Sequence, residues 1–444
     1  MTDISLEFIQ DLLRDDYPDV DIEEFEVMFN LGAPGSKRGD NYTSMVYRIT
    51  LKGIRKHVEP DGSAESHETW KGSLIYKCLP ESILRREAFK SDELFRNEVA
   101  FYTKIWPAMS SFQSQWKVKQ PFKGIPKCYL ARNDCVVLKD LKQYGFVMPD
   151  RRQGLTVAEC YVVLKNLSQY HALSMAMKCH NAEKFFELLN EKDGINEGKI
   201  YNIDYYRTYY NEAIQNAIAM VEEELKDSET KNFYLEKFRK FCSEDTFFTM
   251  MVDLVKPREP LAVICHGDCW TNNFQFRYAD GEIAEVRNNN YYVYNMYYLR
   301  DNLGSIPIGM EHQVNCLSRY KIIYIDRSSG RKTMYFVDFQ LVRYASPALD
   351  LVYIMYLCLD RNQRQEHQDS LLQYYVDELQ ERLAQTCDQE AGFLGSLDRD
   401  RLIQEEFTRC SPFGLGVALD MLPILTCDSN EAPNVYQQEV NKKF

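Results

Sequence analysis

The chain of 444 residues carries a formal net charge of -13 and is 45% hydrophobic. Because a single hydrophobic core stops growing at about 250 to 300 residues, this length predicts two lobes or domains. Nonspecific binding to a polyphosphate backbone needs a clustered basic face, which the acidic balance disfavours. Nucleic acid is therefore not an expected partner.

The 13 cysteines lie in a long chain and include no Cys-x-x-Cys pair that would suggest zinc or redox chemistry. Free thiols in a reducing compartment are therefore expected. The amino terminus lacks the basic-then-apolar order of a signal peptide, and no apolar run approaches the roughly 18 residues that a transmembrane helix needs. These features predict a cytoplasmic protein without a membrane segment, and none of them indicates an obligate protein partner.

The first part of the chain predicts a small, strand-rich region. Apolar spacing predicts a short helix at 5–14, followed by strands at 26–31 and 44–52. The loop 32–41 between the strands holds three glycines, which allow backbone amides to approach a phosphate group. An ordinary flexible hairpin loop explains the same composition.

A lysine and a glutamate follow on neighbouring elements. Residues 70–78 have the pattern of a strand that contains Lys77, and residues 94–106 have the apolar spacing of a helix that contains Glu98. Most such pairs are solvated surface pairs that contribute only about 0 to 1 kcal/mol. Their position on adjacent elements, upstream of the acidic motifs described below, favours a functional pair.

A boundary near residue 140 is predicted to divide the chain into a first lobe, 1–140, and a second lobe, 141–444. Beyond this boundary, Thr156 and Glu159 have the spacing of a capping box at the start of a helix. Mostly helical segments continue to about residue 255. The second lobe is therefore expected to be rich in helices.

Two short apolar strands run directly into carboxylates. The strand 261–265 leads into His266-Gly267-Asp268, and the strand 334–337 leads into Asp338. A lone Asp after a strand is usually a helix cap or a turn former. Two such residues, with Asn273 five positions after Asp268, instead indicate a metal and phosphate site.

This spacing suits phosphoryl transfer from ATP, which needs a carboxylate at the attacking hydroxyl and oxygen ligands for magnesium. Asp268 is predicted to be the catalytic carboxylate, and Asn273 and Asp338 are predicted to ligate the metal. Gln340 stands where protein kinases have the glycine of their Asp-Phe-Gly motif. Switching of an activation loop is therefore not expected.

Three further polar residues have competing explanations. His266 is a candidate catalytic residue, as a general base or metal ligand, although a structural ring bonded to backbone or carboxylate is favoured. His171, in an apolar helix, has the pattern of a satisfied core histidine. An unpaired Asp350 in the apolar run 348–353 would be costly, so it is expected to brace the catalytic loop.

The pattern His-Gly-Asp-x-Trp-x-x-Asn-x-x-Phe, from His266 to Phe276, resembles the insect ecdysteroid kinase-like family, which is related to choline kinases and aminoglycoside phosphotransferases. Further matching segments span most of the chain: 39–42 with Ser44, Lys77, 95–102, 167–174, 337–344, 346–351 and 422–423. The resemblance implies an α+β, two-lobed protein kinase-like fold, with a small β-rich first lobe and a larger helix-rich second lobe.

The resemblance also implies how ATP and magnesium would bind. Lys77 would contact the phosphates, and Glu98 would hold Lys77 in place. The segment that runs from Gly39 through Asn41 to Ser44 would cover the nucleotide.

Backbone groups from Val137 to Leu141 would hold adenine between the lobes. Lys139 in this linker departs from the acidic residue that is usual in the family. Because backbone groups bind adenine, little loss of ATP binding is expected from this change.

The implied activity is transfer of the γ-phosphoryl group of ATP to a hydroxyl of a small molecule, with an ecdysteroid or another hydroxylated lipid or xenobiotic as acceptor. The absence of an Ala-Pro-Glu motif after Asp338 disfavours a protein substrate. Two alternatives stay open: a choline- or aminoglycoside-type kinase, and a nucleotide-binding pseudokinase without turnover.

Residues 286–327 separate the two Asp motifs with a stretch rich in Asn, Tyr, Ile and Met, where the family usually has a short hairpin. Long loops beside active sites are often substrate lids. The residues are also those of AT-rich codons, and Val286-Arg287 can be encoded by a splice-donor-like sequence, so a translated intron is the favoured explanation. Either interpretation predicts an insertion outside the core.

Overall fold

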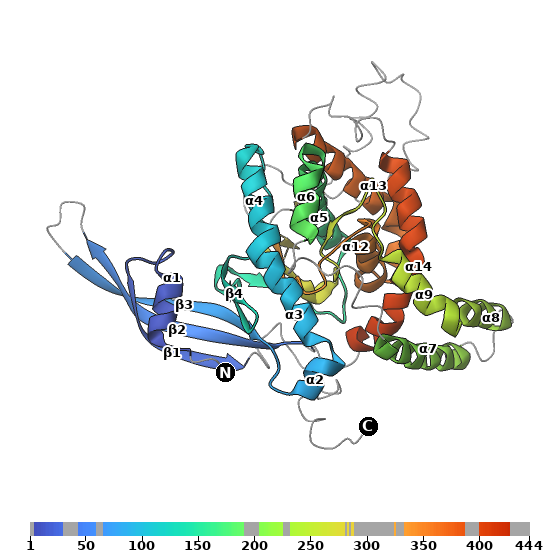
Figure 1. The fold of residues 1–444 in the computed structure, drawn as a ribbon, viewed down its shortest axis with the longest axis horizontal. Helices are drawn as coiled ribbons and strands as arrows, with labels where there is room; N and C mark the ends of the chain where they lie inside the picture. The colour runs from blue at the N-terminus through green and yellow to red at the C-terminus, as the bar shows by residue number, and fades with distance from the viewer. Residues whose placement is uncertain are drawn as a thin grey trace, which may run out of the picture.

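The structure is a computed structural model that describes residues 4–29, 43–58, 65–190, 204–224, 231–279, 282–283, 286–287, 324–325, 333–386 and 399–426. Gly39, Asn41 and most of the predicted insertion lie outside these residues. Figure 1 shows a sheet-rich first lobe in blue beside a second lobe built mainly of helices. The predicted α+β class with two unlike lobes is confirmed.

The first lobe is built on a five-stranded antiparallel sheet with the order β1-β2-β3-β5-β4. Its strands are β1 (Val20–Phe29), β2 (Met45–Val58), β3 (Glu65–Cys78), β4 (Cys128–Arg132) and β5 (Cys135–Lys139). Strands β1 to β3 are longer than the apolar runs that predicted them. The reason is that ladder pairing continues into polar residues, as where His57 of β2 lies opposite Ser66 of β3.

The two faces of this sheet have different partners, because successive side chains of a strand point to opposite faces. Helix α1 (Leu6–Leu13) packs on one face, over a small core that includes Tyr76 and Val137. Val136, on the other face, belongs to the large core that extends through the second lobe. Lys77 lies opposite Val136 in the ladder and therefore points toward the second lobe.

A line of helices connects the sheet to the second lobe: α2 (Ile83–Ala88), α3 (Ser91–Ala100), a π-helical turn (Phe101–Ile105) and α4 (Trp106–Gln115). The sequence predicted one helix at 94–106, and the observed helical line is longer at both ends. Figure 1 shows α3 and α4 in line between the sheet and the second lobe. Glu98 on α3 is therefore carried to the interface of the lobes.

The second lobe is organised around α5 (Val157–His180), which is buried along most of its length and packs along α13 (Arg361–Thr386). The predicted capping box between Thr156 and Glu159 opens α5. The other α-helices among the described residues of this lobe are α6 (Ala182–Asn190), α7 (Asp204–Glu224), α8 (Lys231–Phe241), α9 (Glu244–Leu254), α12 (Ala348–Tyr353) and α14 (Arg399–Thr426). Within the described part of the chain, no helix combines the length and apolarity that crossing a membrane requires.

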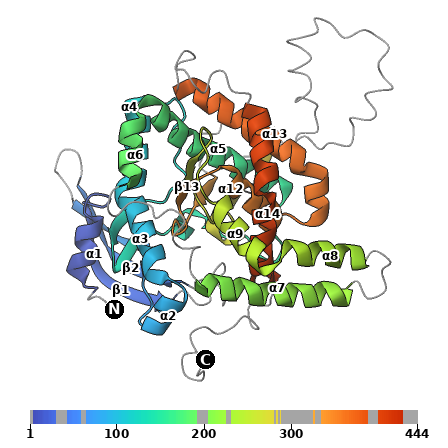
Figure 2. The same cartoon turned by 45° about the vertical axis from the view of Figure 1, so that its right-hand side comes forward.

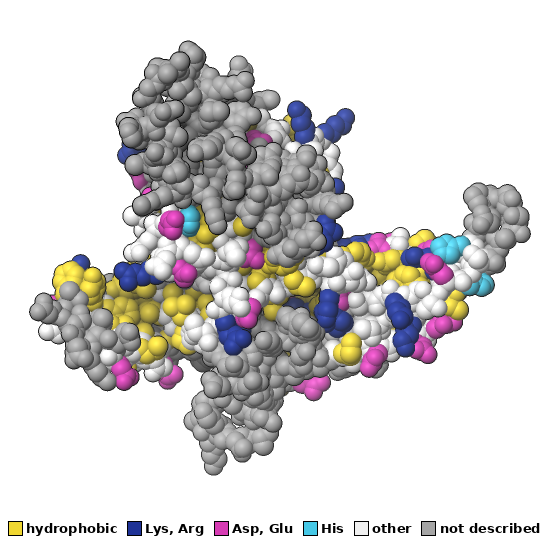
Figure 3. All heavy atoms as spheres, turned by 180° about the vertical axis from the view of Figure 1, so that it is seen from behind, with side chains coloured by type: hydrophobic (Ala, Val, Ile, Leu, Met, Phe, Trp, Pro, Cys, Tyr) yellow, Lys and Arg dark blue, Asp and Glu magenta, His cyan; other side chains and the backbone are white. Residues whose placement is uncertain are grey.

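Helices α7 and α8 lie side by side at the edge of the second lobe (Figure 2). Apolar side chains gather at the end of the molecule formed by these helices (Figure 3), where Met220, Phe233 and Tyr234 are exposed. Elsewhere on the face in Figure 3, acidic and basic side chains of the described residues are interspersed.

Short antiparallel strand pairs carry the two predicted carboxylates. Strand β7 (Val263–Cys265), which precedes Asp268, pairs with β13 (Arg343–Ala345). Strand β12 (Met334–Phe336), which precedes Asp338, pairs with β8 (Phe274–Ala279). The loop after each strand therefore starts from a buried framework of the second lobe.

Other short strands complete this framework. Strand β6 (Phe146–Val147), just beyond the predicted lobe boundary, pairs with β8, as does β9 (Glu282–Ile283). Strand β10 (Val286–Arg287) pairs with β11 (Tyr324–Ile325), so the two ends of the predicted insertion lie next to each other.

Candidate active site

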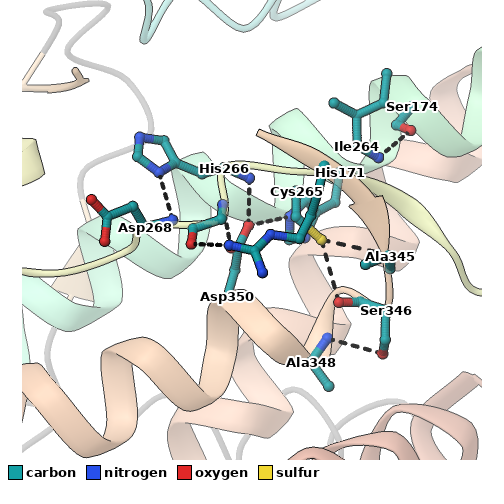
Figure 4. A network of polar contacts seen from close by, with 12 residues as sticks. His171, Ser174, Ile264, Cys265, His266, Asp268, Ala345, Ser346, Ala348 and Asp350 are labelled. Carbon is teal, nitrogen blue, oxygen red and sulfur yellow. Dashed lines mark hydrogen bonds and ion pairs between the residues drawn. The ribbon is translucent and has the colours of Figure 1, made fainter. Parts of the chain in front are cut away.

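Asp350, at the start of α12, anchors the loop that follows β7. Its carboxylate is fully buried and accepts hydrogen bonds from the backbone amides of His266 (2.7 Å) and Gly267 (2.8 Å). Nε2 of His171 lies 3.1 Å from Asp350, and Nδ1 of the same ring lies 2.8 Å from the hydroxyl of Tyr375. Figure 4 shows Asp350 pointing at the backbone beside His266. The predicted bracing role of Asp350 is confirmed.

The charge of Asp350 is stabilised by these contacts. Burial alone would raise the pKa of the Asp350 carboxyl, but the hydrogen bonds from His171 and from the amide of Gly267 bring the pKa below its ordinary value. His171 is fully buried with both ring nitrogens in contact with polar partners, as expected of a core histidine.

Gly267 allows the loop to turn sharply just before Asp268. Its φ of +84° lies in the left-handed region, and a Cβ at this position would lie 1.9 Å from the carbonyl oxygen of Leu341. The buried guanidinium of Arg343 donates to the carbonyl oxygens of both Gly267 (2.9 Å) and Leu341 (3.2 Å). Arg343 thus ties the loop before Asp268 to the loop after Asp338.

The imidazole of His266 is occupied by backbone contacts. Nε2 lies 3.0 Å from the carbonyl oxygen of Val337, and Nδ1 accepts from the amide of Asp268 at 3.2 Å. Because a carbonyl oxygen can only accept, Nε2 carries the proton and the ring is neutral, and burial lowers the pKa of His266. The geometry therefore favours the structural role of His266 over a general base.

Asp268 projects away from this buried network (Figure 4). Its Oδ2 accepts hydrogen bonds from Nδ2 of Asn273 (2.8 Å) and Nε1 of Trp270 (3.2 Å). Nδ2 of Asn273 also donates to the carbonyl oxygen of Asp268 at 2.9 Å. Burial, with the nearby charge of Asp338, raises the pKa of Asp268 to about 7 against the effect of these hydrogen bonds. The five-residue spacing thus brings the predicted amide and carboxylate together.

Lys77 joins the two lobes through a buried ionic cluster. Its ammonium lies 2.6 Å from Oε2 of Glu98 on α3 and 2.8 Å from Oδ1 of Asp338 in the second lobe. Burial alone would lower the pKa of Lys77, but the two carboxylates raise it above its ordinary value. Burial also raises the pKa of Glu98 to about 7, although the charge of Lys77 opposes this shift. The predicted Lys77–Glu98 pair is therefore buried rather than solvated.

Asp338 is the member of this cluster that reaches solvent. Its side chain is 20% exposed, compared with 6% for Lys77 and 1% for Glu98. Carboxylate and amide oxygens are the ligands that magnesium prefers, so the side chains of Asp338 and Asn273 have the chemistry that fits this ion. The ammonium of Lys77 beside them suits the phosphates that would accompany the metal.

A second group of potential ligand atoms belongs to the buried framework. His171, Cys265 and Asp350 place their ligand atoms close together with no exposure. Asp350 and His171 have the hydrogen bonds described above, and Sγ of Cys265 lies 3.3 Å from the carbonyl oxygen of Ser346 (Figure 4). Because all three side chains have these partners within the protein, we interpret the cluster as structural support.

The residues predicted to bind the nucleotide are only partly described. Ser44 is buried beside the start of β2, and Val137 is buried on the α1 side of the sheet. The ammonium of Lys139 lies 4.3 Å from the ring centre of Tyr144, in a cation–π contact. The side chain of Lys139 is therefore engaged with Tyr144, and its backbone amide donates to the carbonyl oxygen of Lys127 at 2.9 Å.

Asp140, which follows this linker strand, was not singled out from the sequence. Its Oδ2 accepts from Nε of Arg48 (2.6 Å) and Oγ of Ser73 (2.8 Å), and its Oδ1 accepts from the amide of Lys142 (3.0 Å). Asp140 thus fixes the linker to β2 and β3. Neither Asp140 nor Arg343 has a local sequence signal beyond a charge at the edge of an apolar run.

The sheet-rich first lobe, the helix-rich second lobe and the buried cluster between them have the architecture of the kinase-like phosphotransferase fold. The family model of the ecdysteroid kinase-like family matches residues 38–288 and 322–387. The chain therefore belongs to the ecdysteroid kinase-like family, a family of small-molecule phosphotransferases. The match is interrupted at residues 289–321, within the predicted insertion.

The solved structures to which the chain is similar include several antibiotic phosphotransferases. Macrolide 2'-phosphotransferase type I is 10% identical, with 96% of this chain and 94% of that chain covered and a TM-score of 0.30. Macrolide 2'-phosphotransferase MphH from Brachybacterium faecium is 11% identical, with coverages of 97% and 98% and a TM-score of 0.29. The streptomycin-ATP-APH(2")-IIa ternary complex is 10% identical, with coverages of 96% and 100% and a TM-score of 0.29. Such low values carry no information about substrate, and no curated protein matches the chain.

Proposed function

We propose that the protein transfers the γ-phosphoryl group of ATP, with magnesium, to a hydroxyl of a small molecule. One observation carries the proposal: Asn273, whose side chain holds Asp268, accepts a hydrogen bond from the amide of Val337 (3.0 Å), directly before the Asp338 that pairs with Lys77. A carboxylate for the acceptor, oxygen ligands for a metal and a cation for phosphates are the groups that this reaction requires.

Asp268 acts on the acceptor. Among the described residues, the side-chain hydrogen bonds to Asp268 both end on Oδ2, which leaves Oδ1 for the acceptor hydroxyl. Asp268 orients the hydroxyl and takes its proton as the oxygen forms a bond to the γ-phosphorus and the bond from that phosphorus to the β,γ-bridging oxygen breaks. ADP and the phosphorylated acceptor leave. His266 holds the loop in place and stays neutral.

Lys77, Asp338 and Asn273 hold the nucleotide end of the site. Bound magnesium-ATP supplies the phosphoryl group, and the ion offsets the negative charge of its phosphates. Asp338 and Asn273 would ligate the ion, and Lys77 would contact the phosphate oxygens. Glu98 keeps Lys77 at the lobe interface, and the backbone from Val137 to Leu141 would hold adenine.

The acceptor class is proposed from the family. The name of the ecdysteroid kinase-like family supports an ecdysteroid, or another hydroxylated lipid or xenobiotic, as the first compound to test. The test is transfer of label from [γ-32P]ATP to an ecdysteroid, to choline and to an aminoglycoside, with Asp268→Asn as the matched inactive variant. Label on the ecdysteroid that requires Asp268 would support the proposal.

The same assay, combined with calorimetry of ATP binding, separates the alternatives. Label on choline or the aminoglycoside alone would show that the protein is a kinase for that class of acceptor and not for ecdysteroids. Magnesium-dependent ATP binding without label on any acceptor would favour a pseudokinase over the enzyme. Equal turnover by the wild type and Asp268→Asn would overturn the catalytic assignment.

A further inference from the structure

Gln340 receives hydrogen bonds from two separate elements of the first lobe. The hydroxyl of Thr43 donates to its side-chain Oε1 at 2.7 Å, from a position 297 residues earlier in the chain. Nδ2 of Asn97 on α3 donates to its backbone oxygen at 3.2 Å and lies 3.4 Å from the backbone oxygen of Val342. A glycine at position 340 would keep the backbone acceptor and lose the partner of Thr43.

These contacts close a ring that runs through both lobes. Thr43 directly precedes Ser44 and strand β2, and Val46 of β2 lies opposite Lys77 of β3. Lys77 pairs with Asp338, and Gln340 lies two residues beyond Asp338. The bond from Gln340 to Thr43 completes the ring. A displacement of the start of β2 therefore strains the position of Asp338, and the reverse is equally true.

Asp338 needs such external restraint because its own backbone is in an uncommon conformation. Its φ of +65° lies in the left-handed region, which costs a residue with a Cβ about 1 kcal/mol or more and persists only where surrounding contacts determine it. Phe339 supplies one restraint, since its ring stacks on Phe101 with centroids 3.8 Å apart. Gln340 supplies a second restraint, because its side chain accepts a hydrogen bond from Thr43, just before β2.

We propose that Gln340 is a positioning residue that, through its hydrogen bond with Thr43, fixes the start of β2 relative to Asp338. Ser44 and Asp338, which belong to the phosphate and metal sides of the proposed site, are thereby aligned across the lobe interface. The proposal rests on the proposed function for its ligand, magnesium-ATP. The mechanical coupling itself is a property of the protein alone.

The first test is a double-variant cycle on magnesium-ATP affinity, measured by calorimetry. Gln340→Met removes the acceptor at similar length, Thr43→Val removes the hydroxyl at similar shape, and Thr43→Ser keeps the hydroxyl as the matched control. A neutral hydrogen bond is worth about 1 kcal/mol, so each disabling change should weaken binding about fivefold. The double variant should also bind magnesium-ATP about fivefold more weakly, because the two changes remove the same hydrogen bond. Independent losses that multiply to about 25-fold would overturn the coupling.

The second test needs no ligand and measures amide hydrogen exchange in the free protein. Gln340→Met should speed exchange in residues 43–48, and Thr43→Val should speed exchange in residues 336–342. Thr43→Ser should leave both segments near the wild-type rate. Faster exchange confined to the segment that carries the substitution would overturn the proposal.

The two tests separate this proposal from the proposed function. Wild-type protein that binds no magnesium-ATP would overturn the proposed function. Faster amide exchange in the segment opposite each substitution would still establish the coupling. Wild-type binding with additive variants and purely local exchange would remove the coupling and leave the proposed function standing.

Discussion

The two loops that carry the acidic residues are held in different ways. The loop from His266 to Asn273 is fixed within the second lobe, by Asp350 and Arg343 and by hydrogen bonds inside the loop. The segment from Asp338 to Gln340 takes its polar restraints largely from the first lobe. The acceptor side of the site is thus built into one lobe, whereas the metal side depends on how the lobes meet.

This difference suits the chemistry that is proposed for each loop. A carboxylate that must meet a hydroxyl within hydrogen-bonding reach benefits from a position that does not change with lobe movement. Groups that bind a nucleotide between the lobes must adjust to both of them. Substitutions in each loop should therefore affect different steps, and the largest effect is expected at Asp268.

Asp268→Asn should lower kcat by about 10²- to 10⁴-fold, the range of a lost general base, while magnesium-ATP affinity stays near wild type. The reason is that Asp268 acts on the acceptor and is not among the groups proposed to bind magnesium-ATP. Turnover and calorimetry measured on one preparation check this split. Asp369→Asn, an exposed change of the same type on α13, is the control and should change neither value. Near-normal turnover in Asp268→Asn would show that another group serves the acceptor.

Asp350→Asn should lower the free energy of unfolding by about 3 kcal/mol, because an amide cannot accept from the backbone amides of His266 and Gly267 as the buried carboxylate does. Urea unfolding at pH 7 measures the loss. An unchanged midpoint would mean that the loop holds its shape without Asp350.

The same variant has a defined pH dependence. The folded pKa of Asp350 lies below its ordinary value, so its ionic contribution to stability is present above the unfolded pKa of about 4 and is lost as the pH falls through the lower folded value. The stability gap between wild type and Asp350→Asn should therefore be constant from about pH 7 to 5 and should narrow below about pH 4. A gap that widens on acidification would contradict the assignment of charge to Asp350.

Asp338→Ala should weaken nucleotide binding in magnesium by about 100-fold, equivalent to about 3 kcal/mol of lost charge-assisted interactions, and should leave metal-free binding less affected. Lys77→Ala should weaken both forms to a similar degree, because an ammonium contacts phosphate whether or not a metal is present. Calorimetry with ATP in magnesium and in EDTA distinguishes the two patterns. If Asp338→Ala lost no magnesium dependence, the metal ligand would have to be another residue.

Replacing residues 288–323 with Asn-Gly should have the smallest effect. Arg287 and Tyr324 already lie opposite each other in an antiparallel pair, which a two-residue turn can close. The melting temperature should change by less than about 3 °C, and magnesium-ATP affinity should be retained. The direct junction of Glu285 to Ser328 is the companion deletion. Loss of folding in both would show that the segment is part of the core, and loss of acceptor turnover alone would favour a lid.

Much of the site could be predicted because its parts are local. A five-residue spacing places Asn273 against Asp268 within one short loop, and strand parity directs Lys77 to the face that meets the second lobe. The capping box of α5 is local in the same way. The fold class followed from the order of such elements and from the resemblance to a known family.

Other features depended on the tertiary structure because they join residues that are distant in the sequence. His171 meets Tyr375 across 204 residues, and Thr43 meets Gln340 across 297 residues. No local pattern specifies such pairs, since they form only after the cores and the lobes have packed together. The sequence by itself therefore predicted which residues would carry the proposed chemistry. The packing of the lobes decided how each of them is held, and whether its side chain or its backbone is available.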